Sequence, residues 1–379
     1  MENMENYEAR RDKIFSWMES EGLTLILFED NETRPDPNIR YLTGQPGNAL
    51  LVLLLKGRTH EKHALLIPWD YNMAQRLANT DEIIPYADFE RDAVAGLLEV
   101  TKMNKVPRGS KLEIPSVTSY PDFLKYVQAI DGYDILCRSN GAASFISELR
   151  SIKDEEEIAL YREISAITND LIDTLQQMVQ SSEDISEAEL ALCIELEARR
   201  MGCEGTGFET LCAGSERSYG IHAFPAYTAE DFATPGLSII DFGIKYRGYT
   251  SDVTLTFARD LSNEQKQFVF LVENAYDMAA ALLKPDMEAW KVAAAVEKYF
   301  AQSKCIMPHA LGHGIGLEAH EAPFLRNRKG NTAVLQPGMV LTLEPGLYHP
   351  ATGGCRLEND FLITPTGAQV LTKSRVIQI

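Results

Sequence analysis

Four carboxylates and one imidazole in the second half of the chain are the residues best suited to chemistry. They are Asp241, Asp252, His313, Glu344 and Glu358. All five lie in apolar, strand-like or glycine-rich segments, where an unpaired carboxylate is costly to bury. A positive charge must therefore compensate the acids. This oxygen-rich set suits two divalent cations, of which Mn²⁺ fits best by ligand softness, while Co²⁺, Zn²⁺ and Fe²⁺ use similar donors.

The carboxylates follow a repeated pattern. A Pro-Gly turn precedes Asp241 by six residues and another precedes Glu344 by seven, and a further acid, Asp252 or Glu358, opens the next predicted strand in each half. Two helix–helix–sheet halves related by a pseudo-twofold axis would bring both pairs together. The alternative is that arginines neutralise the acids separately. Arg356 could do so for Glu358, because residues two apart share one face of a strand.

Histidines accompany the carboxylates. The segment G-H-G-I-G-L-E-A-H-E, Gly312 to Glu321, places glycines on both sides of His313, so that backbone can pass close to bound metals, and adds His320 seven residues on. It lacks the H-E-x-x-H spacing of a single-zinc helical protease. Alone, His320 or His222 would be interpreted as structural, but their context favours a functional role.

Two rounds of helices and strands must position these groups. S-x-x-D/E capping signals and apolar residues at three- and four-residue steps predict the helices, and Pro-Gly turns followed by apolar runs predict the strands. The first predicted helix begins at Ser151 and ends near Gln180, and the second begins at Ser186. Two further helices are predicted over residues 262–283 and 287–302, and strand-like segments over 234–243 and 336–346.

The first part of the chain has a different pattern. Short apolar runs alternate there with helix-length amphipathic stretches, which predicts an α/β domain. The runs cover residues 23–28, 49–55, 64–67, 111–114 and 133–136, and the helical stretches cover 71–79 and 93–102. No cluster of catalytic spacing occurs in it, so we expect it to frame a site, support oligomerisation or shape specificity. A break near 138–151 predicts domains over 1–145 and 151–379.

Composition excludes several classes of protein. With 36 basic and 55 acidic side chains among 379 residues, the net charge of −19 argues against partners such as nucleic acids and anionic membranes. The longest apolar run has seven residues, against roughly 20 for a membrane span. The charged first residues carry no export signal, which predicts a cytoplasmic protein. Six cysteines without C-x-x-C spacing are predicted to be mostly buried, with no thiolate zinc site.

Four segments carry a family resemblance. I-I-D-F-G-I-K-Y-R-G-Y-T-S-D-V-T-L-T-F, G-H-G-I-G-L-E-A-H-E-A-P, T-L-E-P-G-L-Y and R-L-E-N-D-F-L-I-T resemble, in order, the signature blocks of the pita-bread metallopeptidases. That superfamily includes Xaa-Pro aminopeptidase, prolidase, methionine aminopeptidase and creatinase. The likeness covers about Ser151 to Ile379, and N-I-R-Y-L-T-G resembles part of the creatinase/prolidase-type extension. It implies an α/β N-terminal domain followed by an α+β pita-bread catalytic domain with a pseudo-twofold internal repeat.

The resemblance also implies roles for the five candidate ligands. Asp241 would bind one metal, Asp252 and Glu358 would bridge two, and His313 and Glu344 would bind the other. Glu344 would also take the proton from a bridging water, whose hydroxide attacks the substrate, and pass it to the leaving amine. Because simple methionine aminopeptidases generally lack an N-terminal extension, the Xaa-Pro branch is the closer match.

Three histidines gain roles in the same way, and two positions depart from the family pattern. His320 would contact the substrate and stabilise the tetrahedral intermediate, His222 would lie over the scissile bond, and His309 would line the pocket. Leu255 stands where many relatives have an arginine, so any contact of that arginine is missing. Asn359 stands where many have a second acid, outside the five ligands.

These expectations predict a cytosolic dinuclear metallopeptidase that releases the N-terminal residue from peptides with proline in second position. A close variant is prolidase, which cleaves only Xaa-Pro dipeptides. A creatinase-like C–N hydrolase and a non-catalytic binding protein are further alternatives, and the intact set of five ligands counts against both. The resemblance also suggests a homodimer.

Overall fold

The chain forms two compact units in a computed structural model that describes residues 4–57, 59–182 and 184–379. We call Met1–Leu149 the N-terminal unit and Arg150–Ile379 the C-terminal unit. The helix α6 (Ala142–Ser151) occupies the stretch that the sequence predicts as a break. The division between the units falls near the end of this helix.

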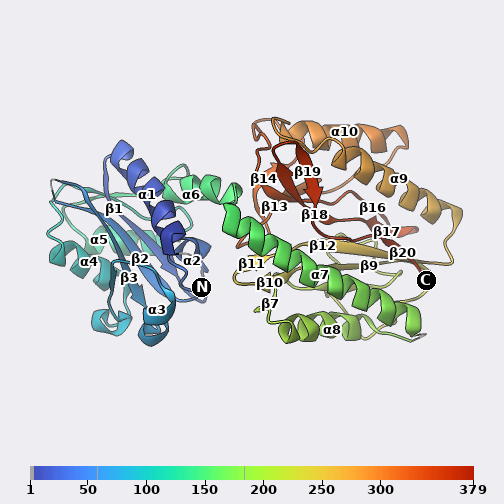
Figure 1. Cartoon of the computed structure of the whole chain (residues 1–379), viewed down its shortest axis with the longest axis horizontal. Coiled ribbons are helices and arrows are strands. Elements are labelled where there is room, and N and C mark those ends of the chain that lie inside the picture. Colours follow the sequence, from blue (N-terminus) through green and yellow to red (C-terminus); the bar gives the residue numbers. More distant parts are fainter. Residues whose placement is uncertain (1–3, 58, 183) are drawn as a thin grey trace. The chain divides into compact units, whose positions relative to one another are not determined.

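The N-terminal unit is an α/β sandwich around a six-stranded mixed sheet of order β4-β3-β2-β1-β5-β6, with helices on both faces (Figure 1). The strand β2 lies inside this sheet and is buried along seven of its eight residues, as expected for a strand covered on both sides. The predicted α/β domain is confirmed. Its elements are α1 (Met4–Glu21), β1 (Leu23–Asp30), α2 (Pro37–Thr43), β2 (Ala49–Lys56), β3 (Glu61–Pro68), α3 (Tyr71–Leu77), β4 (Glu82–Ile83), the 3₁₀ helix η1 (Tyr86–Phe89), α4 (Ala93–Met103), β5 (Lys111–Glu113), α5 (Tyr120–Ala129) and β6 (Asp134–Leu136).

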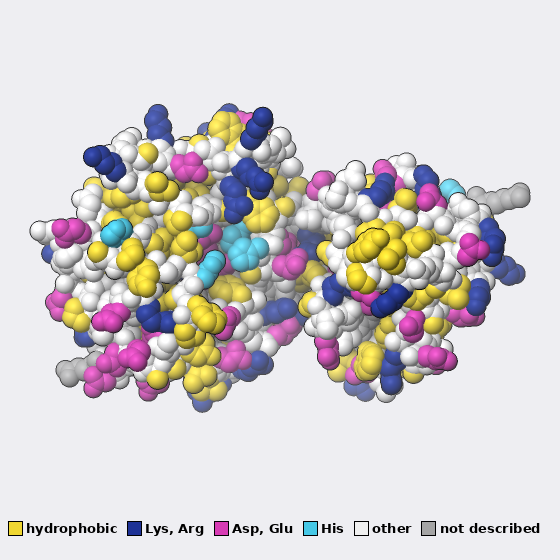
Figure 2. All heavy atoms as spheres, turned by 180° about the vertical axis from the view of Figure 1, so that it is seen from behind, with side chains coloured by type: hydrophobic (Ala, Val, Ile, Leu, Met, Phe, Trp, Pro, Cys, Tyr) yellow, Lys and Arg dark blue, Asp and Glu magenta, His cyan; other side chains and the backbone are white. Residues whose placement is uncertain are grey.

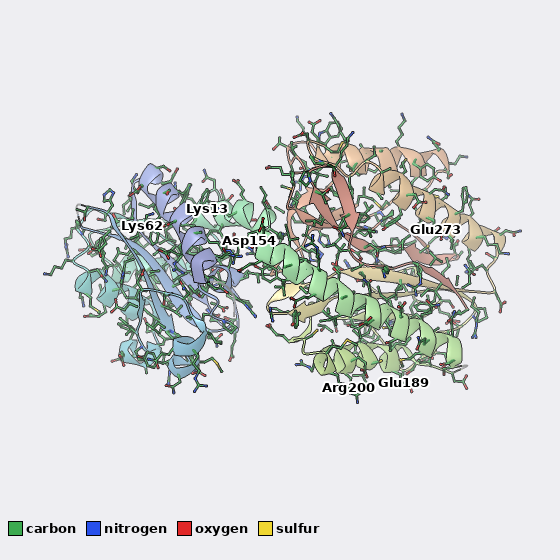
Figure 3. The ribbon with its side chains drawn as sticks, in the orientation of Figure 1. Lys13, Lys62, Asp154, Glu189, Arg200 and Glu273 are labelled. Carbon is green, nitrogen blue, oxygen red and sulfur yellow. The ribbon has the colours of Figure 1, made fainter. Side chains whose placement is uncertain are left out.

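The C-terminal unit begins with the helix pair α7 (Glu155–Ser181) and α8 (Glu187–Arg200). The first helix starts at Asp154 and not at Ser151 as predicted, because the side chains of Asp154 and Glu157 form a reciprocal capping box. Ser186 caps the second helix as predicted. In Figure 3, Asp154 marks the start of α7, and Glu189 and Arg200 mark the two ends of α8.

The second helix pair, α9 (Asn263–Ala280) and α10 (Ala289–Gln302), repeats this arrangement near the predicted positions. Figure 1 shows the strands of the unit between the two helix pairs. They form sheets of order β11-β10-β7, β20-β12-β9-β8, β14-β13-β15-β18-β19 and β16-β17. The strands are β7 (Gly205–Thr206), β8 (Leu211–Ala213), β9 (Gly236–Phe242), β10 (Ile244–Tyr246), β11 (Tyr249–Thr250), β12 (Val253–Arg259), β13 (Gly312–Gly314), β14 (Glu321–Leu325), β15 (Val340–Leu343), β16 (Gly346–His349), β17 (Gly353–Arg356), β18 (Asn359–Thr364), β19 (Gly367–Val370) and β20 (Val376–Gln378).

Strand register explains how the repeat brings the predicted carboxylates together. The antiparallel pair β9–β12 opposes Asp241 to Thr254, and Asp252 directly precedes β12. The pair β15–β18 ends where Leu343 opposes Asn359, so the next acids, Glu344 and Glu358, lie just beyond that end. An isolated bridge between Thr254 and Glu358 joins the two halves.

Two predictions about the chain as a whole have different outcomes. All six cysteines are free, but only Cys203, Cys212 and Cys355 are buried, so the prediction that most are buried is wrong. Cys137 is exposed because it follows a short edge strand of the N-terminal unit. Among the described residues, no helix is long and apolar enough to cross a membrane.

Candidate metal centre and substrate pocket

A cavity of about 470 Å³ in the C-terminal unit brings the predicted site residues together. Figure 2 shows histidine and acidic side chains gathered in a hollow of this unit. The eight predicted residues that line the cavity are Asp241, Asp252, His313, Glu344, Glu358, His222, His309 and His320. They come from elements of both halves of the repeat, and from loops between them. The residues selected from the sequence therefore lie together around one cavity.

Three of the candidate ligands form the tightest group in the cavity. One ligand atom from each of Asp252, His313 and Glu358 lies within 4.8 Å of the others, and all three residues are buried. Nε2 of His313 lies 3.7 Å from Oδ2 of Asp252 and 3.6 Å from Oε1 of Glu344. Carboxylate oxygens and an imidazole nitrogen at this spacing can coordinate a common divalent cation.

The tautomer of His313 follows from its second ring nitrogen. Nδ1 lies 3.2 Å from the carbonyl oxygen of Gly314, and a carbonyl can only accept a hydrogen bond. Nδ1 therefore carries the proton, and the lone pair of Nε2 points to the carboxylates. Burial and the neighbouring His320 lower the pKa of His313 to about 3, so the ring is neutral at physiological pH. A neutral imidazole fixed through its other nitrogen is the usual form of a metal-binding histidine.

The carboxylates are destabilised as anions in the absence of a cation. Burial raises the pKa of Asp252 and of Glu344 well above the ordinary range, and the charge of Glu358 adds to both effects. Burial and the charge of Asp241 raise the pKa of Glu358 to about 7. Proteins bury acids at this density when a cation or a shared proton compensates them. The donor set therefore fits divalent metal ions.

Among the residues that the structure describes, Asp241 is the one candidate ligand that forms an ion pair with an arginine or lysine. Nη2 of Arg356 donates to its Oδ2 at 2.5 Å, whereas its buried Oδ1 has no hydrogen-bond partner. Arg356 thus forms an ion pair with Asp241 and acts on Glu358 only through its nearby charge, which lowers the pKa of that acid without offsetting its burial. Glu358 accepts from the hydroxyl of Thr254 at 2.7 Å. One arginine cannot balance four carboxylates, and the unpartnered oxygen of Asp241 fits a metal ligand.

Arg356 and Tyr348 connect Asp241 to a pocket histidine. Nη1 of Arg356 donates to the hydroxyl oxygen of Tyr348 at 2.7 Å, and that hydroxyl lies 3.0 Å from Nε2 of His309. Nδ1 of His309 contacts the carbonyl of Ala310 at 2.7 Å, so Nδ1 donates and Nε2 accepts. Burial and Arg356 lower the pKa of His309 to about 4. His309 is therefore a neutral residue held by tyrosine at the pocket wall.

The other two histidines differ in their anchoring. The ring of His320 lies 4.3 Å from that of His313, centroid to centroid, and burial lowers its pKa. His222 lies on the loop between β8 and β9. The backbone of this loop is joined to the site by Arg356, whose Nη1 donates to the carbonyl of Ile221 at 3.2 Å. The structure thus places both histidines at the cavity, as the sequence predicts.

The residues that sequence reasoning missed include Arg326, which lines the pocket, and Tyr348, which contacts the lining residue His309. Tyr348 follows the E-P-G turn, and Arg326 follows β14 after the G-H-G-I-G segment. Arg326 makes no ion pair with any residue that the structure describes, and it lines the pocket. Neither residue belongs to the repeated spacing. The chain positions of a tyrosine and an arginine near the motifs were the only signal in the sequence.

The two positions that depart from the family pattern lie away from the candidate ligands. Leu255 is buried opposite Ile240, and alternation along β12 turns it away from the face on which Thr254 meets Glu358. Asn359 donates to the hydroxyl of Tyr276 at 3.0 Å and accepts from the amide of Ser374 at 2.6 Å. Asn359 therefore anchors the C-terminal segment.

Helix pairs around antiparallel sheets, with repeat-related acids meeting a histidine in one cavity, define a metallopeptidase of the pita-bread fold. The chain belongs to metallopeptidase family M24, whose model matches residues 159–365. A second model, the creatinase/prolidase N-terminal domain, matches residues 10–118. The predicted family and fold class are confirmed. Members of this family are metal-dependent, in agreement with the group formed by Asp252, His313 and Glu358.

Relatives extend the likeness to nearly the whole chain. An uncharacterized peptidase of Bacillus subtilis, YqhT, is 30% identical over 343 residues, covering 89% of this chain and 91% of that protein. An Xaa-Pro dipeptidase of Pyrococcus horikoshii is 29% identical over 373 residues, covering 96% of each. The solved structure of an Xaa-Pro dipeptidase from Bacillus anthracis is 26% identical, with a TM-score of 0.84 over 99% of this chain and 100% of that one.

Proposed function

We propose that the protein is a metal-dependent peptidase that hydrolyses the bond between an N-terminal residue and proline. The observation that carries this proposal is the convergence of four carboxylates and three further histidines around His313 in one cavity. The relatives named Xaa-Pro dipeptidase supply the substrate class. The bond before proline is a tertiary amide with a restrictive ring, so a dedicated pocket is chemically sensible.

The chain's own residues divide the chemistry between them. Asp241, Asp252, His313, Glu344 and Glu358 would hold two divalent cations, with Mn²⁺ preferred. Bound cations would supply a Lewis acid and lower the pKa of a coordinated water. Glu344 would take up the proton of the attacking water and deliver it to the proline nitrogen as the bond breaks.

Two histidines would act on the substrate itself. His320 would donate to the oxygen on which negative charge develops, a contact that is stronger in the transition state than in the ground state. His222 would lie over the scissile bond and orient it. His309 would shape the wall of the pocket from its fixed position beside Tyr348, and burial and the charge of Arg356 keep its ring neutral by lowering its pKa.

Arg326 favours a dipeptidase over the aminopeptidase that the sequence places first. Its guanidinium is a pocket cation without an ion-pair partner among the described residues, and a dipeptide ends in a carboxylate one residue beyond the scissile bond. Arginine binds a carboxylate through two parallel hydrogen bonds. A tripeptide would place a neutral amide at this position and continue past it.

The decisive experiment compares Ala-Pro with Ala-Pro-Ala, using metal-stripped protein with and without Mn²⁺ and Ala-Ala as the control peptide. We expect Mn²⁺-dependent cleavage of Ala-Pro and much slower cleavage of the other two. Arg326→Gln should raise KM for Ala-Pro about tenfold or more, whereas Arg328→Gln, an exposed neighbour that does not line the pocket, should not. Preferential cleavage of Ala-Pro-Ala would restore the aminopeptidase. Cleavage of neither proline peptide by metal-loaded protein would refute the proposed function.

A further inference from the structure

The loop over residues 214–228 carries His222 into the pocket without any helix or strand of its own. It follows β8 and also contributes Phe224, whose side chain is 97% exposed, to the wall of the pocket. A segment of this length without regular structure needs anchors outside itself if its histidine is to occupy one position. Those anchors determine how well His222 can act.

Glu187 joins both ends of this loop through one carboxylate. Its Oε1 accepts from the amide of Gly214 at 2.7 Å and from Nε of Arg217 at 3.1 Å. Its Oε2 accepts from both the amide and the hydroxyl of Thr228, each at 2.7 Å. The side chain is 1% exposed, so water does not compete for these bonds. Each oxygen is thus saturated by one end of the loop.

Neighbouring contacts make this arrangement specific. A Cβ atom at Gly214 would lie 2.8 Å from the carbonyl oxygen of Asp231, so that carbonyl leaves room only for glycine at the position where the loop bonds to Glu187. Nη2 of Arg217 also donates to the carbonyl of Pro225 at 2.8 Å. The ion pair between Glu187 and Arg217 therefore fixes the loop at its beginning, and the second bond of Arg217 fixes it at Pro225, next to the exposed Phe224.

Other hydrogen bonds join the loop to the strands of the site. They run from the amide of Cys212 to Ala226, from the amide of Gly354 to the Ser218 hydroxyl, and from Arg356 to Ile221. The first of them joins the strand before the loop to a residue near its far end through the backbone alone. Glu187 is the side chain that bonds both ends of the loop, and it lies at the first residue of α8, outside the candidate metal ligands.

We infer that Glu187 is a positioning residue, which closes the loop over 214–228 and so holds His222 at the substrate. This inference rests on the proposed function. Glu187 does not line the substrate pocket, and within the described part of the chain its carboxylate bonds to the loop and to no candidate ligand, so it acts through the loop. Small displacements of a reacting or orienting group can reduce catalysis by about 100-fold. The carboxylate therefore governs turnover from outside the pocket.

The test compares Glu187→Gln with Glu189→Gln in the full-length protein. The glutamine at 187 keeps the size of the side chain but turns an amide N–H₂ toward N–H donors of the loop. Glu189 is exposed on the same helical turn, and its side chain hydrogen-bonds to Ser186 and to no other residue that the structure describes. Glutamine preserves its capping role, and Figure 3 labels Glu189 on α8. The readouts are hydrogen exchange of the Arg217 and Ser218 amides, Mn²⁺ binding by calorimetry, and kcat and KM for Ala-Pro.

We expect Glu187→Gln to accelerate amide exchange in the loop, to leave Mn²⁺ affinity within twofold of the wild type, and to lower kcat/KM about 10- to 100-fold. Glu189→Gln should change none of these. Adding His222→Ala to Glu187→Gln should cost much less than His222→Ala alone, because the histidine is already misplaced. If Glu187→Gln is poorly folded, Thr228→Val, which removes one of the four donors, should show the same pattern more weakly.

Two results would overturn the inference. Unchanged loop exchange in Glu187→Gln would mean that the carboxylate does not close the loop. Faster exchange with wild-type kcat/KM, or full additivity with His222→Ala, would mean that closure does not position the histidine. Failure of the wild-type protein to cleave Ala-Pro would instead refute the proposed function, and hydrogen exchange would still decide whether Glu187 closes the loop.

Discussion

The hydroxyl oxygen of Tyr348 lies 3.0 Å from Nε2 of His309. Because Nδ1 of His309 donates to a backbone carbonyl, the hydroxyl must donate to Nε2 while it accepts from Arg356. Arg356 in turn donates to Asp241. A continuous chain of hydrogen bonds thus links a pocket histidine to a candidate metal ligand.

Removal of this hydroxyl should weaken catalysis without unfolding the protein. Tyr348→Phe deletes one donor and leaves Nε2 of His309 without its partner, at a cost of about 1 kcal/mol. We expect kcat/KM for Ala-Pro to fall about five- to tenfold. Steady-state kinetics at fixed Mn²⁺ would measure the change, with Tyr299→Phe on α10 as a control outside the pocket. Wild-type kinetics in Tyr348→Phe would show that this chain of bonds does not support the site.

The sequence predicts the carboxylates better than their supports, for a physical reason. Asp241 and Glu344 end strands whose next partner strand begins beside Asp252 and Glu358, so local spacing determines their meeting through antiparallel register. The pairing of Arg356 with Asp241 depends instead on how β17 packs near β9, 115 residues away in the chain. No local pattern encodes such a contact.

The same distinction explains the misplaced helix start and the overlooked residues. Ser151 and Asp154 both satisfy a capping pattern, and only the position of α6 decides between them, because Ser151 is the last residue of that helix. Glu187 directly follows the N-cap Ser186, a position where an acidic side chain is commonly exposed and favours the helix dipole. Its burial arises from the loop that folds back over it, which only the tertiary structure reveals.

Metal affinity should depend on Asp252 and not on charge in general. Asp252→Asn removes an anionic donor from the group with His313 and Glu358, and a neutral amide is a poorer ligand for a divalent cation. We expect Mn²⁺ affinity to fall at least tenfold in calorimetry of metal-stripped protein. Asp260→Asn, an exposed acid just beyond the other end of β12, is the matched control and should bind Mn²⁺ normally. Equal affinities in both variants would exclude Asp252 as a ligand.

Stability of the metal-free protein should decrease as pH rises. The pKa of Glu358 is raised to about 7 by burial and Asp241, so the folded protein holds a proton that the unfolded chain releases near pH 4.5. This contribution is complete below pH 4.5 and is lost as pH rises through about 7; it amounts to roughly 1 to 3 kcal/mol. Thermal unfolding of stripped protein should therefore show a falling midpoint between pH 5 and 8.

Bound Mn²⁺ should abolish the fall of the unfolding midpoint with rising pH. A bound cation favours the ionised carboxylates, and proton release makes metal affinity increase with pH. Scans with Mn²⁺ should show a midpoint that no longer falls, and Glu358→Gln should flatten the profile of the stripped protein. A metal-free midpoint that rises over this range would contradict the assignment of a raised pKa to Glu358.

We expect proton transfer in the reaction to depend on the carboxylate of Glu344, which no other residue replaces. Its carboxylate oxygens lie 3.6 Å from Nδ1 of His309 and 3.6 Å from Nε2 of His313, and burial raises its pKa well above the ordinary range. Glu344→Gln keeps the shape of the side chain but cannot accept a proton. We expect kcat to fall about 100- to 10,000-fold, with a much smaller change in KM.

The measurement requires Mn²⁺ occupancy to be confirmed by calorimetry in the same sample, because Glu344 is also a candidate ligand. Near-normal turnover of the metal-loaded variant would assign proton transfer to another group, and His320→Ala would then be the variant to compare.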